Sequence, residues 1–160
     1  MSAEALLTVM ERLISYHQSL YELAGKKTDM IKKGDMAALD QMLKDEQTHV
    51  ATIKKLEQAR IQIAVTLVPS IEKPTIADCI QGLEQHDQQA LLEKREQLAS
   101  VIAKLKEKNQ LNQQLIYHSL QYVNLSMNLV NPKAAAQNMN YIHPQKAKSQ
   151  AATGMFQSKV

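Results

Sequence analysis

Hydrophobic residues recur at intervals of three and four positions along most of the chain, a spacing that places them on one face of an α-helix. The first run consists of Leu6, Val9, Met10, Leu13, Tyr16, Leu20, Leu23, Ala24, Met30 and Ile31. It is followed by Lys32, Lys33 and Gly34, which together are typical of a helix C-terminus. We therefore predict a long first helix that ends at Gly34.

A second long helix is predicted between Asp35, which can serve as its N-cap, and Pro69, which cannot continue a helix. Its apolar positions keep the same period over the whole interval. They are Leu39, Met42, Leu43, Val50, Ile53, Leu56, Ile63, Ala64 and Leu67. This pattern predicts a face that packs against the first helix.

A short third helix is predicted after the connector that contains Pro69 and Pro74. Thr75 and Asp78 resemble a capping box, in which each side chain bonds the other residue's backbone amide. The apolar face that follows consists of Ile76, Cys79, Ile80 and Leu83. Cys79 lies on this face, so we expect it to act as a small core residue and not as a nucleophile.

The fourth predicted helix is the longest, with Asp87 as its N-cap and Asn131–Pro132 at its end. Such a helix has about 43 residues and spans about 65 Å, against about 50 Å for the second helix, so it should extend beyond its neighbour. Its expected core stripe is Leu91, Leu98, Ile102, Leu105, Ile116, Leu120, Val123, Met127 and Val130. Asn109 and Asn112 interrupt this stripe, and we expect them to loosen the last turns.

The periodic pattern stops after residue 130, where the apolar content falls. We predict two parts: a helical bundle over residues 1–130 and a flexible C-terminal tail over residues 131–160. Within the tail, Asn131 as N-cap and Pro132 at the first helical position favour one short helical turn. The predicted fold class is all-α, an elongated antiparallel bundle of three long helices plus one short helix.

The composition excludes several classes of protein. With only four isolated Gly, four Pro and no Trp, the chain lacks a glycine-rich phosphate-binding loop and the turn residues of β-sandwiches. The tail carries four Lys and no acid, but the preceding residues are nearly neutral, which disfavours nucleic acid as a partner. No run is apolar enough for a signal peptide or for membrane insertion, and a single cysteine fits a reducing compartment. We therefore expect a cytoplasmic protein.

No catalytic or metal-binding constellation is evident in the sequence. Di-metal sites in helical bundles need two Glu-x-x-His pairs, and this chain has one, Glu46 with His49. No nucleophile has a base and an orienting group at a recognisable spacing. The sequence therefore predicts a protein that is not an enzyme and needs neither a metal nor a cofactor.

A second apolar stripe runs along the distal part of the fourth helix, about 100–180° away from the core stripe around the helix axis. It consists of Leu111, Leu115, His118, Tyr122, Leu125 and Leu129. Exposed apolar patches of this size mark interaction sites, so we predict that these six residues bind a partner. Two alternatives remain open: another helix of the bundle covers the stripe, or two copies pair through it as a homodimeric coiled-coil scaffold or adaptor.

This layout resembles the FlgN family of bacterial flagellar export chaperones, in particular its Bacillus-type members. The resemblance covers residues 1–130 and is strongest in the segments KNQLNQQLI, residues 108–116, and SLQYVN, residues 119–124. It implies a cytoplasmic type III export chaperone that binds C-terminal helical segments of the hook-filament junction proteins FlgK and FlgL. Such a chaperone keeps these proteins unassembled and delivers them to the export apparatus. It is expected to be a monomer or a weak homodimer, and in the family the C-terminal region binds the substrate.

Overall fold

The computed structural model describes residues 2–130, and all the regular secondary structure in this range is helical. The elements are α1 (Ala3–Lys33), α2 (Met36–Leu67), α3 (Ile76–Gln81) and α4 (Gln85–Val130). The prediction of an all-α protein with three long helices and one short helix is thus confirmed. The predicted tail, with its helical turn after Asn131 and Pro132, lies outside the described residues.

The chain divides into two units, residues 1–116 and residues 117–160. The first unit contains α1, α2, α3 and the first part of α4. The described part of the second unit is a single helical segment, residues 117–130 of α4.

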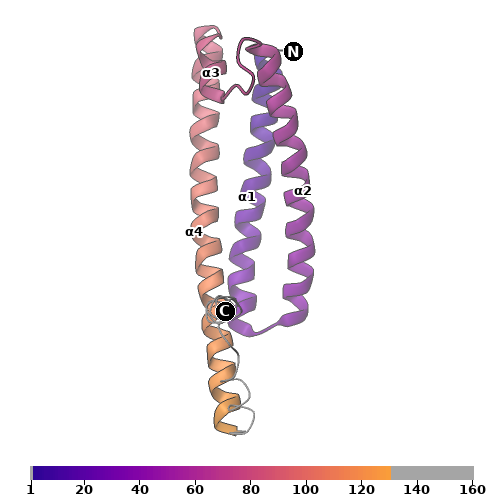
Figure 1. Ribbon diagram of the computed structural model, residues 1–160, viewed down its shortest axis with the longest axis vertical. Helices are drawn as coiled ribbons and strands as arrows, with labels where there is room; N and C mark the ends of the chain where they lie inside the picture. Colours follow the sequence, from indigo (N-terminus) through magenta and orange to yellow (C-terminus); the bar gives the residue numbers. More distant parts are fainter. Residues whose placement is uncertain (1, 131–160) are drawn as a thin grey trace, which may run out of the picture. The chain divides into compact units, whose positions relative to one another are not determined.

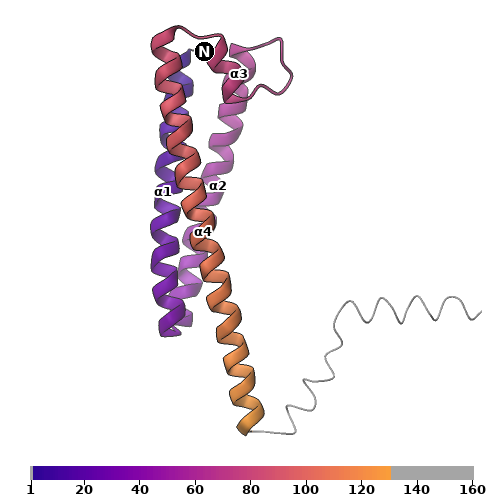
Figure 2. The same cartoon turned by 90° about the vertical axis from the view of Figure 1, so that its left-hand side faces the viewer.

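α1 and α2 form an antiparallel hairpin, which Figures 1 and 2 show as two neighbouring helices joined at one end. Gly34 ends α1 in the left-handed conformation, with φ of 70° and ψ of 25°, and its amide donates to the carbonyl of Ile31. A side chain is strained at such a φ, so the turn favours glycine. Asp35 then caps α2, because its carboxylate accepts a hydrogen bond of 3.0 Å from the amide of Ala38. Both predicted capping residues are confirmed.

The core of the first unit lies along the α1–α2 contact and receives side chains from α3 and α4. Leu6, Met10 and Leu13 of α1 are fully buried, and Leu56 and Ile63 of α2 belong to the same cluster. Two predicted core positions of α2, Leu43 and Val50, are exposed instead. The period places them beside the buried positions, but Val50 lines an open pocket together with residues of α1 and α4, and Leu43 lines an open pocket on α2 itself.

Polar contacts supplement the apolar core between α1 and α2. Lys27 forms an ion pair with Glu46 at 3.1 Å, and the ring of Tyr16 meets that of His49 edge-on, with 5.8 Å between the centroids. Glu46 and His49, the one pair with metal-ligand spacing, are therefore part of the α1–α2 contact. Among residues 2–130, no three His, Cys, Asp or Glu side chains lie close enough together to hold a metal ion.

α3 begins with the predicted capping box. The amide and the hydroxyl of Thr75 donate to Asp78 Oδ2 at 2.7 and 2.6 Å, and the Asp78 amide donates to the Thr75 hydroxyl. The side-chain hydrogen bond from Thr75, followed by the one from its amide, lowers the pKa of Asp78. Cys79 is buried in the core, as predicted, and this burial raises the pKa of its thiol.

α4 begins at Gln85, which makes Glu84 the N-cap position, so the prediction that Asp87 is its N-cap is wrong by three residues. The reason is that Gln88 bonds backward twice, from its amide to the Glu84 carbonyl and from its side chain to the Leu83 carbonyl. Because of these bonds the helix begins before Asp87, and Asp87 lies within its first turn. Leu91 and Leu98 then join the core, and Lys94 forms an ion pair of 3.1 Å with Glu11 of α1.

Candidate partner-binding surface

Within the first unit, α4 is held to α1 by a buried polar contact at Asn112. This residue is only 2% exposed, and its Nδ2 donates to the Ala24 carbonyl at 2.9 Å. The Thr28 hydroxyl donates to Asn112 Oδ1 at 2.5 Å. Asn112 therefore fastens α4 to α1, whereas the sequence suggested that it interrupts their contact. Asn109, the other asparagine of that prediction, is exposed.

The predicted core stripe of α4 is buried only at its beginning. After Leu98, its members Ile102, Ile116, Leu120, Val123, Met127 and Val130 are exposed. Their assignment to the core is therefore wrong in the described part of the chain. The physical reason is clearest in residues 117–130, because a single helical segment cannot bury its own sides.

The structure places the six predicted partner-binding residues as follows. Leu111 is 41% exposed, Tyr122 71% and Leu129 78%, and His118 and Leu125 are also exposed. Leu115 is half-buried. The distal part of α4 thus exposes apolar side chains of both stripes, not of one alone. We use the name terminal segment for residues 117–130.

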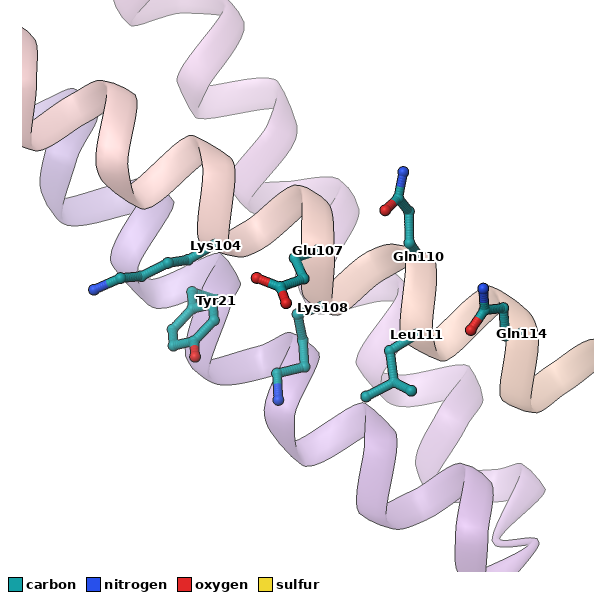
Figure 3. A pocket seen from close by; sticks show the side chains of 7 residues that line it. All are labelled: Tyr21, Lys104, Glu107, Lys108, Gln110, Leu111 and Gln114. Atoms are coloured by element: carbon teal, nitrogen blue, oxygen red, sulfur yellow. The ribbon is translucent and has the colours of Figure 1, made fainter.

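Leu111 lies in an open pocket of about 420 Å³ between α4 and α1. Figure 3 shows Leu111 and Lys108 extending from α4 toward α1, where Tyr21 completes the pocket, whereas Gln110 points away. The Lys108 ammonium lies 6.0 Å from the centroid of the Tyr21 ring, at the outer limit of a cation–π contact. Tyr21 belongs to the candidate surface by position, and the sequence analysis missed it. Only the packing of α1 against α4 brings Tyr21 beside Leu111.

The terminal segment also has a polar side. The side-chain amide of Gln121 donates to the Tyr117 hydroxyl at 2.8 Å, and the Tyr117 and His118 rings meet edge-on with 5.7 Å between centroids. Tyr117 and Gln121 lie four positions apart and therefore share one side of this helix. Asn124 and Asn128 share that side by helical spacing.

The sequence around the terminal segment carries no formal charge. Between Lys108 and Lys133 there is no Asp, Glu, Lys or Arg, and the only ionisable side chains are those of Tyr117, His118 and Tyr122. A partner therefore meets Leu, Val, Met and Tyr side chains separated by amides and hydroxyls. Burial of an exposed Leu contributes roughly 1.5–3 kcal/mol, so even a few of them provide a large driving force for association. None of the described helices is both long and apolar enough to span a membrane.

Comparison with known proteins places the chain in one family. The family model of the FlgN protein matches residues 1–149. A protein of Bacillus subtilis strain 168, described as uncharacterized protein YvyG, is 31% identical over 161 residues, which covers 99% of each chain. No solved structure matches the chain. The described helices agree with the fold that the resemblance implies. The chain therefore belongs to the FlgN family of flagellar export chaperones.

Proposed function

We propose that the distal part of α4 binds C-terminal helical segments of the hook-filament junction proteins FlgK and FlgL. In this proposal the chaperone acts in the cytoplasm, keeps these proteins unassembled and delivers them to the export apparatus. It needs no cofactor and catalyses no reaction. The binding residues are Leu111, Leu115, His118, Tyr122, Leu125 and Leu129.

The observation that carries the proposal is the exposure of apolar side chains on an uncharged helix. Tyr122, Leu125 and Leu129 present large side chains to solvent, and residues 117–130 contain no ionic group that would keep such a surface apart from other apolar surfaces. An amphipathic helix of a partner can bury them by packing its own apolar face along α4. A junction protein whose terminal helices are unpaired before assembly offers such a face.

The chemistry of the surface predicts how the affinity depends on salt. Apolar burial is insensitive to ionic screening, whereas pairing of exposed charges weakens as salt is added. The dissociation constant of the complex should therefore change less than about threefold between low and high salt. A steep loss of affinity with salt would point to the Lys residues of the chain as the binding groups.

The test compares two triple variants of the full chain. Tyr122→Asp, Leu125→Asp and Leu129→Asp together place three charges on the second stripe. Their matched control, Gln121→Asp, Asn124→Asp and Asn128→Asp, places the same three charges on the polar side of the same segment. Because both variants add aspartates near the helix C-terminus, they share any cost to helix stability from the helix dipole.

The measurement is calorimetric titration of each variant with the C-terminal segments of the FlgK and FlgL proteins of the same organism. Each buried Leu or Tyr contributes roughly 1.5–3 kcal/mol, so the stripe variant should lose at least about a hundredfold in affinity. The control should stay within about threefold of the unchanged protein. Equal losses in both variants, or none in either, would contradict the proposed site. Light scattering on the free chain distinguishes the alternative, because a dimer that persists on dilution would mean that a second copy occupies the stripe.

A further inference from the structure

A second candidate binding site lies within the first unit, far along the chain from the terminal segment. Residues of α2, the connector before α3, the start of α3 and the first part of α4 line an open pocket of about 650 Å³. This volume is typical of ligand sites. The lining residues are Glu57, Arg60, Ile61, Lys73, Pro74, Thr75, Ile76, Ala77 and Arg95.

The pocket combines apolar walls with an excess of positive charge. Ile61, Pro74, Ile76 and Ala77 form the apolar part. Three cations, from Arg60, Lys73 and Arg95, face one carboxylate, that of Glu57, which leaves a net charge of plus two. This imbalance contrasts with the near-neutral body of the chain.

Arg60 is held in position by the protein itself. Its Nε donates to Glu57 Oε2 at 2.8 Å, and its side chain is only 17% exposed. This bond uses Nε alone, so the two terminal guanidinium nitrogens remain available to a ligand. A planar guanidinium that is already oriented loses little entropy when it binds a second carboxylate.

Lys73 and Arg95 supply charge that the protein does not neutralise. Both are exposed, and neither takes part in an ion pair within the described part of the chain. Thr75, by contrast, is fully engaged, because its amide and hydroxyl both donate to Asp78. The groups of the pocket that remain available to a ligand are therefore cationic, and they come from α2, the connector and α4.

We propose that this pocket binds an acidic peptide segment that also carries an apolar side chain. Carboxylates of the peptide pair with Arg60, Arg95 and Lys73, while a Leu-like side chain packs against Ile61, Pro74 and Ile76. Two unpaired cations are too few for a nucleic-acid backbone, whose binding needs many phosphate contacts. A small inorganic anion would make no use of the apolar walls. The site is independent of the proposed FlgK and FlgL surface and gives the chaperone a second contact for a protein partner.

The probe is a blocked hexapeptide of alternating Glu and Leu, titrated into the isotope-labelled full chain and followed by nuclear magnetic resonance. We expect the backbone amides of Ile61, Ile76 and Ala77 to shift in a saturable way. The same peptide with Gln in place of Glu should bind at least about tenfold more weakly, because charge-assisted hydrogen bonds are lost. Equal binding of the two peptides, or shifts that avoid the pocket, would overturn the proposal.

A charge-reversal pair tests the residues themselves. Lys73→Glu with Arg95→Glu should weaken binding of the acidic peptide by at least about tenfold. The control, Lys55→Glu with Lys106→Glu, makes the same change in net charge at exposed positions outside the pocket. If both pairs weaken binding equally, only long-range attraction is involved and the pocket is not the site. If inorganic phosphate shifts the same amides as strongly as the peptide does, the pocket is a plain anion site and the proposal fails. Neither result bears on the FlgK and FlgL surface, because the peptide does not probe it.

Discussion

α1 and α4 have similar apolar periods in sequence but differ sharply in how much of that pattern they bury. α1 has 31 residues and buries eight of them, from Leu6 near its start to Ile31 near its end. α4 has 46 residues and buries three, Leu91, Leu98 and Asn112. A helical period therefore identifies residues that share a face, but only a neighbouring helix decides whether that face is buried.

The two helices also differ in the kind of side chain that makes their contacts with neighbouring helices. α1 meets α2 through large apolar side chains, with Leu6, Met10 and Leu13 wholly buried. At its last buried position, α4 meets α1 through an amide, since Asn112 bonds to Ala24 and Thr28. An apolar contact tolerates small shifts, whereas a buried amide needs its partners at fixed distances. At Asn112 the α1–α4 contact is thus specific in register.

The largest expected effect separates buried from exposed leucines. Leu13→Ala in α1 and Leu91→Ala in α4 each remove a fully buried side chain and should lower the free energy of unfolding by about 2–5 kcal/mol. Leu120→Ala and Leu129→Ala make the same chemical change at exposed positions and should stay within about 0.5 kcal/mol. Urea denaturation followed by circular dichroism measures all four. A large loss for Leu129→Ala in the isolated chain would show that the terminal segment is covered after all, and would remove the basis of its proposed role.

A smaller effect is expected at the polar contact that holds α4. Asn112→Ala removes the two hydrogen bonds between α4 and α1, one to the Ala24 carbonyl and one from the Thr28 hydroxyl, and should lower the unfolding free energy by about 1–3 kcal/mol. Asn109→Ala, three residues earlier on an exposed position, is the matched control and should have little effect. Similar losses at both positions would mean that helix propensity, and not the buried hydrogen bonds, determines the result.

The features that could be predicted from the sequence are those with local causes. Gly34, Asp35 and the Thr75–Asp78 capping box were all identified correctly, because a cap depends on residues within four positions of it. The start of α4 was misplaced because the side chain of Gln88, which bonds to the Leu83 carbonyl, extends the helix before Asp87. No simple sequence pattern predicts a hydrogen bond of this kind.

The burial of faces could not be predicted in the same way. Ile116, Val123 and Met127 have the same spacing as Leu91 and Leu98, yet they are exposed. Tyr21 was not suspected, because its place beside Leu111 depends on a contact between helices more than eighty positions apart in the chain. The predicted partner-binding residues themselves came from the period of α4, and their role stays a prediction until binding is measured.

The smallest expected effect concerns two ion pairs that α1 forms with other described helices. Lys27 and Glu46, which join α1 to α2, have side chains only 16% and 19% exposed, whereas Glu11, which pairs with Lys94 of α4, is 58% exposed. Removing one member of a shielded pair leaves the other charge poorly solvated, so Glu46→Gln should lower the unfolding free energy by about 1–2 kcal/mol. Glu11→Gln should change it by less than about 0.5 kcal/mol, and added salt should abolish even this difference. Chemical denaturation in low and high salt measures both. Equal effects at the two positions would contradict the view that the Lys27–Glu46 pair is shielded from solvent and the Glu11–Lys94 pair is not, because solvent would then screen both pairs alike.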